Sequence, residues 1–413
     1  MEGDRDAQRL TENAIVGAGV AGTALAIALK QSGLAVRLYD QCHQQAAARP
    51  SAPLQISANG TRVLNAIGLK EDLADIALLP QFSTLRHART GFLLSQRPLG
   101  AFSEARYGAA DVLVGYDQLV QLLRRKAAAL GIALETAAPV SSVDAGTATL
   151  TFADGKTIRH QSIAVACGLP TSASHPGLAN LLNERDWSAD GDLVAIQAIG
   201  SRRAPSRDHE RFINTWVADG LIAIEEPIPA RTIAQEAPQP VALTLLAPPG
   251  SAPGANATPE DLYEHLLRRA HPHLSQLIAD PEVAPAAALT AQPVEFWFAE
   301  KLVLLGAACH AHPAFPALNA SAALEDAWIL SRMMERWEES PHEGFADYER
   351  YRKPRARRLR AFAERERASL AEPAGLAAWQ RNLKWSLTSR FLPEIAMQRT
   401  DWLYGYDCIK GFA

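Results

Sequence analysis

Three glycines near the start of the chain are the first residues whose spacing could do chemistry. Gly17, Gly19 and Gly22 follow the apolar run 14–16 in the order G-x-G-x-x-G. In this spacing the first glycine permits a tight turn, the second lets a pyrophosphate approach the backbone, and the third lets the next helix pack on the strand. The N-terminus of that helix attracts phosphates through its free N–H groups and its dipole. The spacing therefore predicts a pyrophosphate-binding turn.

The residues around these glycines predict the elements that must position them. A helix-forming run covers 21–31, and a second strand covers 35–39 and ends at Asp40. Asp40 follows the turn by about 20 residues, where an acidic side chain accepts a hydrogen bond from a ribose hydroxyl. A glycine-rich turn without a ligand is the alternative interpretation. The complete strand, turn, helix and strand unit favours a dinucleotide site.

A later segment has the same architecture with a different loop. An apolar strand at 302–305 leads into Gly306, then a loop, then a helix that carries Glu325 and Asp326. Ala307 stands directly after the glycine, where a carboxylate that binds a cofactor hydroxyl would be expected. The loop contains His310, which could orient a substrate or shuttle a proton near neutral pH, or could simply hold the loop by hydrogen bonding.

Two further groups of residues could do chemistry, a His pair and a carboxylate pair. His310 and His312 form an H-x-H pair, but apart from Cys309 no Cys or carboxylate has a fitting spacing, so no metal site is predicted. Glu225 and Glu226 end the strand-like run "LIAIEE", and strand alternation should turn one of them inward. A buried carboxylate could have a raised pKa and act as acid or base; the alternative is that both lie in solvent at a strand end.

Composition limits the class of protein. The chain has 413 residues, of which 48% are hydrophobic and 21% charged, which indicates a globular protein with a large core. A net charge of -4 gives no electrostatic footprint for nucleic acid. The four Cys form no C-x-x-C pair, the N-terminus lacks the pattern of a secretory signal, and no apolar run is long enough to cross a membrane. We expect a cytoplasmic protein with reduced thiols.

The rest of the chain predicts a second sheet and a helical end. Short apolar runs at 81–105 and alternating strands at 186–250 indicate a mostly antiparallel sheet, and Thr258 is placed to cap a helix. An amphipathic helix is expected at 116–131, and Asp154-Gly155 indicates a hairpin. The Arg-rich run 352–367 is interrupted by Glu residues and is typical of a solvated helix face.

Together these motifs resemble the FAD-dependent aromatic-ring hydroxylases. The resemblance rests on the first glycine motif, on "SIAVACGLPTS", and on the late strand, G-x-A-x-H, Pro-rich loop and "LED" helix. The stretches "RPLGAFSEARYGAADV", "EKLVLLGAACH", "YERYRKPRARR" and "DWLYGYD" look most like the salicylate and hydroxynicotinate hydroxylase branch. The similarity spans Ile15 to Asp407.

The resemblance implies a mixed α/β fold with a Rossmann-like FAD-binding domain, an antiparallel substrate-covering sheet and C-terminal helices. The expected boundaries are 10–70, 106–180 and 286–340 for the FAD-binding domain, 71–105 and 181–285 for the sheet, and 341–413 for the helical region. It also implies a monooxygenase that hydroxylates a small aromatic or heteroaromatic substrate with FAD, NAD(P)H and O2. We expect a monomer or a homodimer. The flavin carries the chemistry, and the protein holds ring and substrate together and keeps water out.

The sequence departs from the family at several flavin contacts. Cys167 stands where the family has an acidic residue, Ala307 replaces the Asp that bonds the ribityl chain, and Tyr116 replaces the Arg that reaches the phosphates. The Pro-rich loop reads Phe315 to Ala320, with Leu318 near the expected ring, and 51–59 lacks the usual glycine-rich pattern. Lost charge-assisted hydrogen bonds could weaken binding by about a hundredfold.

Two functions follow from these residues. The first is the flavoprotein monooxygenase with FAD in a modified site. The second is a flavin-free relative that performs acid–base chemistry, such as a cyclisation or isomerisation, or only binds a ligand. The expected catalytic residues are His310, Glu225, Glu226 and Gln55. The expected cofactor-binding residues are Gly17, Ala18, Gly19, Val20, Ala21, Gly22, Asp40, Tyr116, Gly306, Ala307, Leu318 and Asn319.

Overall fold

A six-stranded sheet carries the glycine turn. The computed structural model describes residues 12–42, 52–167, 193–203, 211–229, 239–254, 256–268, 270–285, 287–289, 294–310, 316–370 and 375–412. The strand order is β18 (Phe298–Ala299), β19 (Leu302–Leu304), β11 (Ser162–Val165), β1 (Asn13–Val16), β2 (Val36–Tyr39) and β7 (Ala133–Glu135). All neighbours are parallel except β18 and β19. Since β1 lies between the next strand of the chain and a distant one, the loops diverge at its carboxyl end, where α/β proteins bind ligands.

Helices cover this sheet, and α2 (Val20–Gln31) shows how the apolar content of a helix matches its burial. α2 reads VAGTALAIALKQ, is apolar on nearly every side, and is buried over nine of its residues. It packs against β1, β2, α6 (Tyr116–Ala129) and α10 (Pro316–Arg336). Both α2 and α6 lie close to the expected ranges. The glycine turn therefore sits at the start of a rigid, buried helix.

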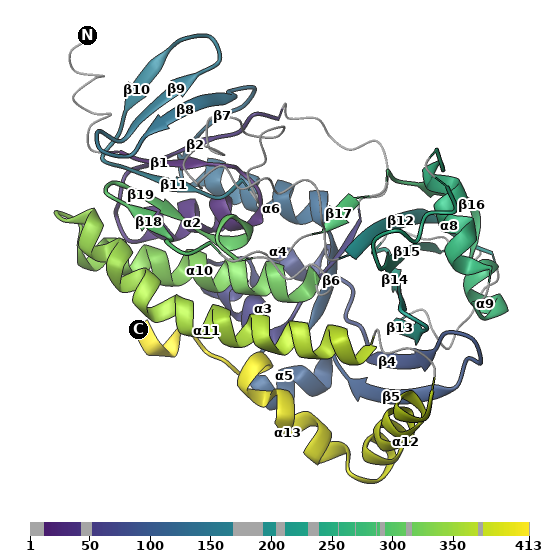
Figure 1. Cartoon of the computed structure of the whole chain (residues 1–413). Coiled ribbons are helices and arrows are strands. Elements are labelled where there is room, and N and C mark those ends of the chain that lie inside the picture. Colours follow the sequence, from purple (N-terminus) through teal and green to yellow (C-terminus); the bar gives the residue numbers. More distant parts are fainter. Residues whose placement is uncertain are drawn as a thin grey trace.

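The second sheet is built from two segments that are distant in sequence. Its strands follow the order β16 (Ile278–Val283), β12 (Leu193–Arg202), β15 (Pro240–Ala247), β14 (Leu221–Pro227), β13 (Phe212–Ala218), β4 (Phe82–His87) and β5 (Leu93–Pro98), and β17 (Ala287–Leu289) pairs with β12. The sheet is mostly antiparallel, as expected, but β13 and β4 are parallel. In Figure 1 this sheet lies at the opposite end of the molecule from the six-stranded sheet.

The two faces of this second sheet have different neighbours. One face packs against α8 (Pro259–Leu267) and the short helix α9 (Pro272–Ser275) through a cluster that includes Trp216, Leu243 and Leu262. We call this the outer face. The opposite, inner face contacts Leu113 and Leu370 from the rest of the chain. Thr258 caps α8 in a capping box with Asp261, which confirms the predicted cap.

Two smaller sheets and three short helices complete the part of the fold around the six-stranded sheet. β3 (Pro53–Ile56) pairs with β6 (Val112–Gly115), and β8 (Val140–Asp144), β9 (Thr149–Phe152) and β10 (Thr157–Arg159) form a separate antiparallel sheet. The β9–β10 pair confirms the predicted hairpin. In chain order, the short helices α3 (Ala58–Ala66), α4 (Lys70–Ala74) and α5 (Ala101–Tyr107) come between β3 and β6.

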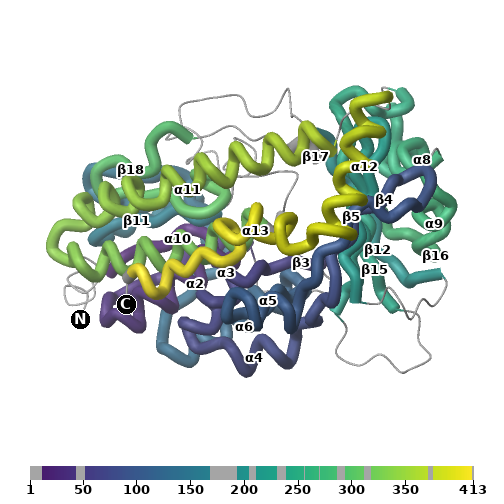
Figure 2. Tube along the Cα trace, turned by 90° about the horizontal axis from the view of Figure 1, so that it is seen from below, coloured from purple at the N-terminus to yellow at the C-terminus, as the bar shows by residue number. Residues whose placement is uncertain are grey.

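A long helix joins the two ends of the molecule. α11 (Pro341–Leu370) packs against β18 and α10 near its start, and Leu370 at its end joins the hydrophobic cluster of the second sheet. Figure 2 shows α11 running along the molecule toward α12 (Leu376–Phe391), with α13 (Pro393–Tyr404) returning beneath it. No helix among the described residues is long and apolar enough to cross a membrane.

Candidate functional site

A cavity opens where β1 leads into α2. Its volume is about 640 Å³, and its described lining comes from the glycine turn, the end of β2, one face of α6 and the start of α10. Nine of the residues expected to bind a cofactor line it: Gly17, Ala18, Gly19, Val20, Ala21, Asp40, Tyr116, Ala307 and Asn319. The sequence motif and the cavity therefore coincide.

The glycine turn has the geometry that its spacing predicts. Gly17 has φ +105°, and a Cβ there would lie 2.8 Å from backbone atoms of Cys167. A Cβ at Gly22 would lie 2.0 Å from the carbonyl oxygen of Gly17, so helix and strand could not pack as closely. Gly19 differs, because a Cβ there would meet only the Tyr116 hydroxyl at 3.3 Å, on the side of the cavity. Gly19 therefore leaves open a cradle that a diphosphate could fill.

Asp40 ends β2 at the rim of the cavity. Its carboxylate accepts a hydrogen bond from the backbone N–H of Cys42 at 3.0 Å and forms an ion pair with Arg124 of α6. Arg124 also donates to the carbonyl oxygen of Ala18, from Nε at 3.1 Å and from Nη2 at 2.9 Å. Sequence reasoning missed Arg124. The signal was its spacing, since 116, 120 and 124 fall on one helical face and all line the cavity.

Tyr116 and Cys167 also line this cavity. Burial, with Asp117 and Asp40 nearby, raises the pKa of the Tyr116 phenol, and burial raises the pKa of the Cys167 thiol to about 12. Both side chains are therefore neutral near pH 7. Neither supplies the charge that the resemblance to the hydroxylases implies at these two positions.

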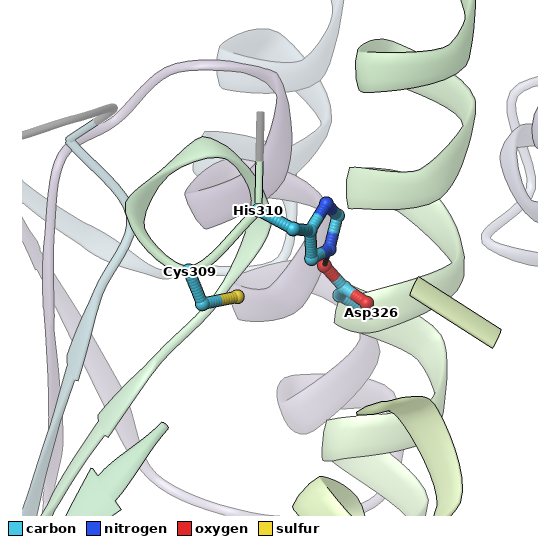
Figure 3. Close-up of side chains that lie close together, drawn as sticks. All are labelled: Cys309, His310 and Asp326. Carbon is cyan, nitrogen blue, oxygen red and sulfur yellow. Dashed lines mark hydrogen bonds and ion pairs between the residues drawn. The ribbon is translucent and has the colours of Figure 1, made fainter. Parts of the chain in front are cut away.

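The loop after β19 is held by a buried acidic residue on α10. Gly306 has φ +62°, and its N–H donates to Oδ2 of Asp326 at 2.9 Å. His310 Nε2 lies 2.5 Å from the same oxygen, and Figure 3 shows its imidazole directed at Asp326. Burial alone would raise the pKa of Asp326, but His310 and Arg352 hold it well below its usual range. Arg352 lies on α11 and also pairs with Glu325 at 2.7 Å.

Cys309, His310 and Asp326 lie close enough to hold a metal ion, but their chemistry is that of a structural network. Their ligand atoms lie within 4.8 Å of one another, and all three residues are buried. The Cys309 thiol donates to the Gly306 carbonyl at 3.3 Å, and burial raises its pKa well above the usual value. Asp326 is already neutralised by Arg352, at 2.7 Å. We assign this cluster the role of fixing the loop that carries Ala307. His312 lies outside the described residues, as does the segment 168–171.

The four expected catalytic residues do not come together, and none of them lines the cavity. His310 is buried against Asp326. Gln55 lies on β3 next to Leu54, and since Leu54 lines the cavity, strand alternation turns Gln55 the other way. Leu318, expected near the cofactor, is buried in a cluster with Leu359 and Leu403. Gly22 and Gly306 shape the turns without lining the cavity.

Glu225 and Glu226 lie on opposite faces of the second sheet. The Glu225 carboxylate is fully buried on the outer face, 2.9 Å from Arg202 and 3.1 Å from His273. Glu226 shares the inner face with Ile224, which packs against Leu113 of β6. Burial raises the pKa of Glu226 to about 8. Of the two, Glu226 is the carboxyl on the side that faces the rest of the molecule.

Comparison with known proteins agrees with this geometry. The sequence model of the FAD binding domain family matches residues 10–363. The chain is 25% identical over 399 residues to 3-amino-4-hydroxybenzoate 2-monooxygenase of Streptomyces cremeus, covering 95% of this chain and 94% of the relative. It is 27% identical to 6-hydroxynicotinate 3-monooxygenase of Pseudomonas fluorescens, covering 85% and 89%. The crystal structure of Klebsiella pneumoniae HpxO complexed with FAD and uric acid has a similar fold, with a TM-score of 0.75 at 18% identity, covering 94% of this chain and 96% of that one.

Proposed function

The chain belongs to the FAD binding domain family, and from that premise we propose that it is an FAD-dependent monooxygenase that hydroxylates a small aromatic or heteroaromatic acid with NAD(P)H and O2. The observation that carries the proposal is the cavity of about 640 Å³ at the glycine turn, with Gly19 open toward it and Asp40 at its rim. Similarity to hydroxylases of aminohydroxybenzoate and hydroxynicotinate supports the substrate class.

The residues at the glycine turn fit the adenosine diphosphate half of FAD. The backbone at Gly17 to Gly19 and the N-terminus of α2 would hold the diphosphate, because free N–H groups and the helix dipole attract anions. Asp40 would accept from a ribose hydroxyl. Ala307 and Asn319 line the same cavity nearer the start of α10 and would lie along the remainder of the cofactor. When bound and reduced, FAD supplies the reaction of O2 that the side chains cannot supply themselves.

Glu226 is the residue that we propose for substrate contact on the inner face of the second sheet. With its pKa raised to about 8, the carboxyl is protonated at neutral pH and can donate a hydrogen bond to a ring hydroxyl or a carboxylate. No hydrogen bond or ion pair ties it to another described residue. In contrast, His310 is hydrogen-bonded to the buried Asp326 and Glu225 is ion-paired with Arg202, so we assign both residues to structure.

The flavin-free alternative is supported by Ala307 and Tyr116, which supply no charge where the family has Asp and Arg. A flavin titration separates the two functions. The purified protein is mixed with excess FAD, unbound flavin is removed, and the visible spectrum is recorded. Flavin absorption bands that correspond to about one FAD per chain support the monooxygenase. A colourless protein supports the alternative.

Substrate turnover is the second test. The FAD-loaded protein is mixed with NADH or NADPH and, in turn, 6-hydroxynicotinate, 3-hydroxybenzoate and 3-amino-4-hydroxybenzoate. We expect one of these acids or a close analogue to accelerate NAD(P)H oxidation and to yield a product that contains one oxygen atom from labelled O2. NAD(P)H oxidation that yields only hydrogen peroxide with every aromatic acid tested would contradict the proposed hydroxylation.

A further inference from the structure

Arg124 is the only basic side chain among the described residues that line the cavity. Two carboxylates, Asp40 and Asp117, line it as well. A diphosphate brings negative charge into this site, and its repulsion by carboxylates must be offset by a cation or by oriented N–H groups. Tyr116 is neutral where the resemblance to the hydroxylases implies an Arg, so among the described lining residues only Arg124 can supply such a cation. Arg124 lies two helical turns further along the same face of α6.

The contacts of Arg124 hold three elements together. Its Nε and Nη2 both donate to the carbonyl oxygen of Ala18, inside the glycine turn, and Nη2 also pairs with Asp40 at the end of β2. The guanidinium therefore links α6, the glycine turn and the carboxyl end of β2. The side chain is only 17% exposed, so this geometry is held by packing as well as by charge.

Part of the guanidinium is still available to a ligand. Arginine carries five N–H donors, and the contacts with Ala18 and Asp40 use those on Nε and Nη2. Among the described residues, Nη1 donates to none. A planar fork with two remaining N–H groups, beside a turn built for phosphates, is suited to ribose or phosphate oxygens.

We infer that Arg124 binds the adenosine diphosphate half of the cofactor and replaces the charge that the family carries at position 116. Nε and Nη2 hold Asp40 and the glycine turn in place, and Nη1 contacts the ligand directly. This inference rests on the proposed function only for the identity of the ligand as FAD, since ADP presents the same chemistry.

Binding of FAD and of ADP to the wild type, Arg124→Met and Arg125→Met tests the inference, with dissociation constants from isothermal titration calorimetry. Arg125 is the exposed neighbour on α6 and provides the matched control. We expect Arg124→Met to bind both ligands about tenfold to a hundredfold more weakly, and Arg125→Met to bind as the wild type does. FMN lacks the adenosine, so its affinity should be the same in all three proteins.

A double-mutant cycle with Asp40→Asn separates an effect of Arg124 through Asp40 from its effect through the ligand or the glycine turn. If Nη1 contacts the ligand, Arg124→Met still weakens ADP binding in the Asp40→Asn background. If it has no effect there, Arg124 acts only through Asp40 and the direct contact is overturned. Thermal unfolding verifies that each variant is folded, and Arg124→Lys, which keeps the charge but loses the fork, replaces Arg124→Met if that variant does not fold.

The outcomes distinguish the inference from the proposed function. Wild type that binds ADP but not FAD contradicts the flavin chemistry and leaves the test of Arg124 intact. Unchanged affinities for FAD and ADP in Arg124→Met overturn the inference while the monooxygenase proposal stands. Wild type that binds neither ligand overturns both.

Discussion

Glu225 and Glu226 are neighbours on β14, yet their carboxyl groups lie on opposite faces of the sheet and in opposite electrostatic environments. Glu225 lies against Arg202 and His273 and accepts from Nε1 of Trp216 at 3.2 Å. Burial alone would raise its pKa, but the hydrogen bond and charge of His273, together with Arg202, lower it below the usual value. Glu226 is half-buried with no nearby positive charge to offset its desolvation, and its pKa is raised to about 8. One carboxyl is therefore ionised and the other protonated at neutral pH.

The raised pKa of Glu226 predicts a pH-dependent stability. In the folded state this carboxyl holds its proton up to a pH of about 8, whereas in the unfolded chain it loses the proton near its ordinary value of 4.5. Its contribution to stability is therefore fully present below 4.5 and is lost as the pH rises through about 8. Glu226→Gln removes the titration. We expect the free energy of unfolding of the variant to equal that of the wild type near pH 5. Near pH 9 it should exceed the wild-type value by about 1–3 kcal/mol.

Urea unfolding of both proteins at several pH values measures this difference. Glu264→Gln is the control, because Glu264 is exposed on α8 and its replacement should leave the pH profile of the wild type unchanged. If the difference in free energy of unfolding between Glu226→Gln and the wild type does not change with pH, Glu226 ionises normally in the folded protein.

Replacement of Glu225 is expected to destabilise the second sheet strongly. Glu225→Gln leaves Arg202, whose side chain is almost fully buried, without its counter-charge, and breaking a buried pair in this way costs about 3–5 kcal/mol. The double variant Glu225→Gln/Arg202→Met should recover part of that loss, because no unpaired charge then remains. Free energies of unfolding from urea titrations test both statements. Additive losses in the double variant would mean that the two charges are not coupled.

Most of the fold could be predicted from the sequence because its signals are local. The spacing of Gly17, Gly19 and Gly22, the following apolar helix and the strand ending at Asp40 lie within one short stretch of chain, and the structure has this unit with the expected geometry. Thr258 was recognised as a cap for the same reason, since its partner Asp261 is three residues away. The parallel pairing of β13 with β4 was not recognised, because it joins strands about 130 residues apart whose neighbours in sequence give no sign of it.

The site was predicted only in part, for a related reason. The motif located the cofactor cavity, but Arg124 reaches Asp40 across 84 residues, and only the spacing of residues along α6 indicated which way it points. Arg352 was interpreted as part of a solvated basic run. In the structure it is fully buried between Glu325 and Asp326, while the interrupting acidic residues of that run gave no indication of this role. Which charges of a helix are buried depends on how the helix packs against its neighbours. The pattern of residues along the helix does not reveal this packing.

Arg352 and its neighbour Arg350 provide a matched test of that conclusion. Arg352 donates to Glu325 and Asp326 at 2.7 Å each, whereas the Arg350 side chain is 79% exposed and pairs with Asp347. Arg352→Met leaves two buried carboxylates short of a counter-charge, and we expect a loss of about 3–5 kcal/mol or failure to fold. Arg350→Met should change stability by less than about 1 kcal/mol. Thermal unfolding and soluble yield measure both variants. Equal losses of stability in Arg352→Met and Arg350→Met would contradict the buried network.

Ala307 offers a gain-of-function test of the modified flavin site. It lines the cavity directly after Gly306. At this position the resemblance to the hydroxylases implies an Asp that forms a hydrogen bond with the ribityl chain of FAD. Ala307→Asp restores a carboxylate that can accept from a ribityl hydroxyl, and one such hydrogen bond should tighten FAD binding about tenfold. Ala307→Asn is the control for size, because it can accept the same bond without charge and should gain less. FAD dissociation constants from quenching of flavin fluorescence measure both variants. If Ala307→Asp instead weakens binding, the cause would be repulsion from Asp326 or a different path of the cofactor through the cavity. Measurement in Asp326→Asn, provided that this variant folds, separates these causes, because repulsion disappears there and a different path does not.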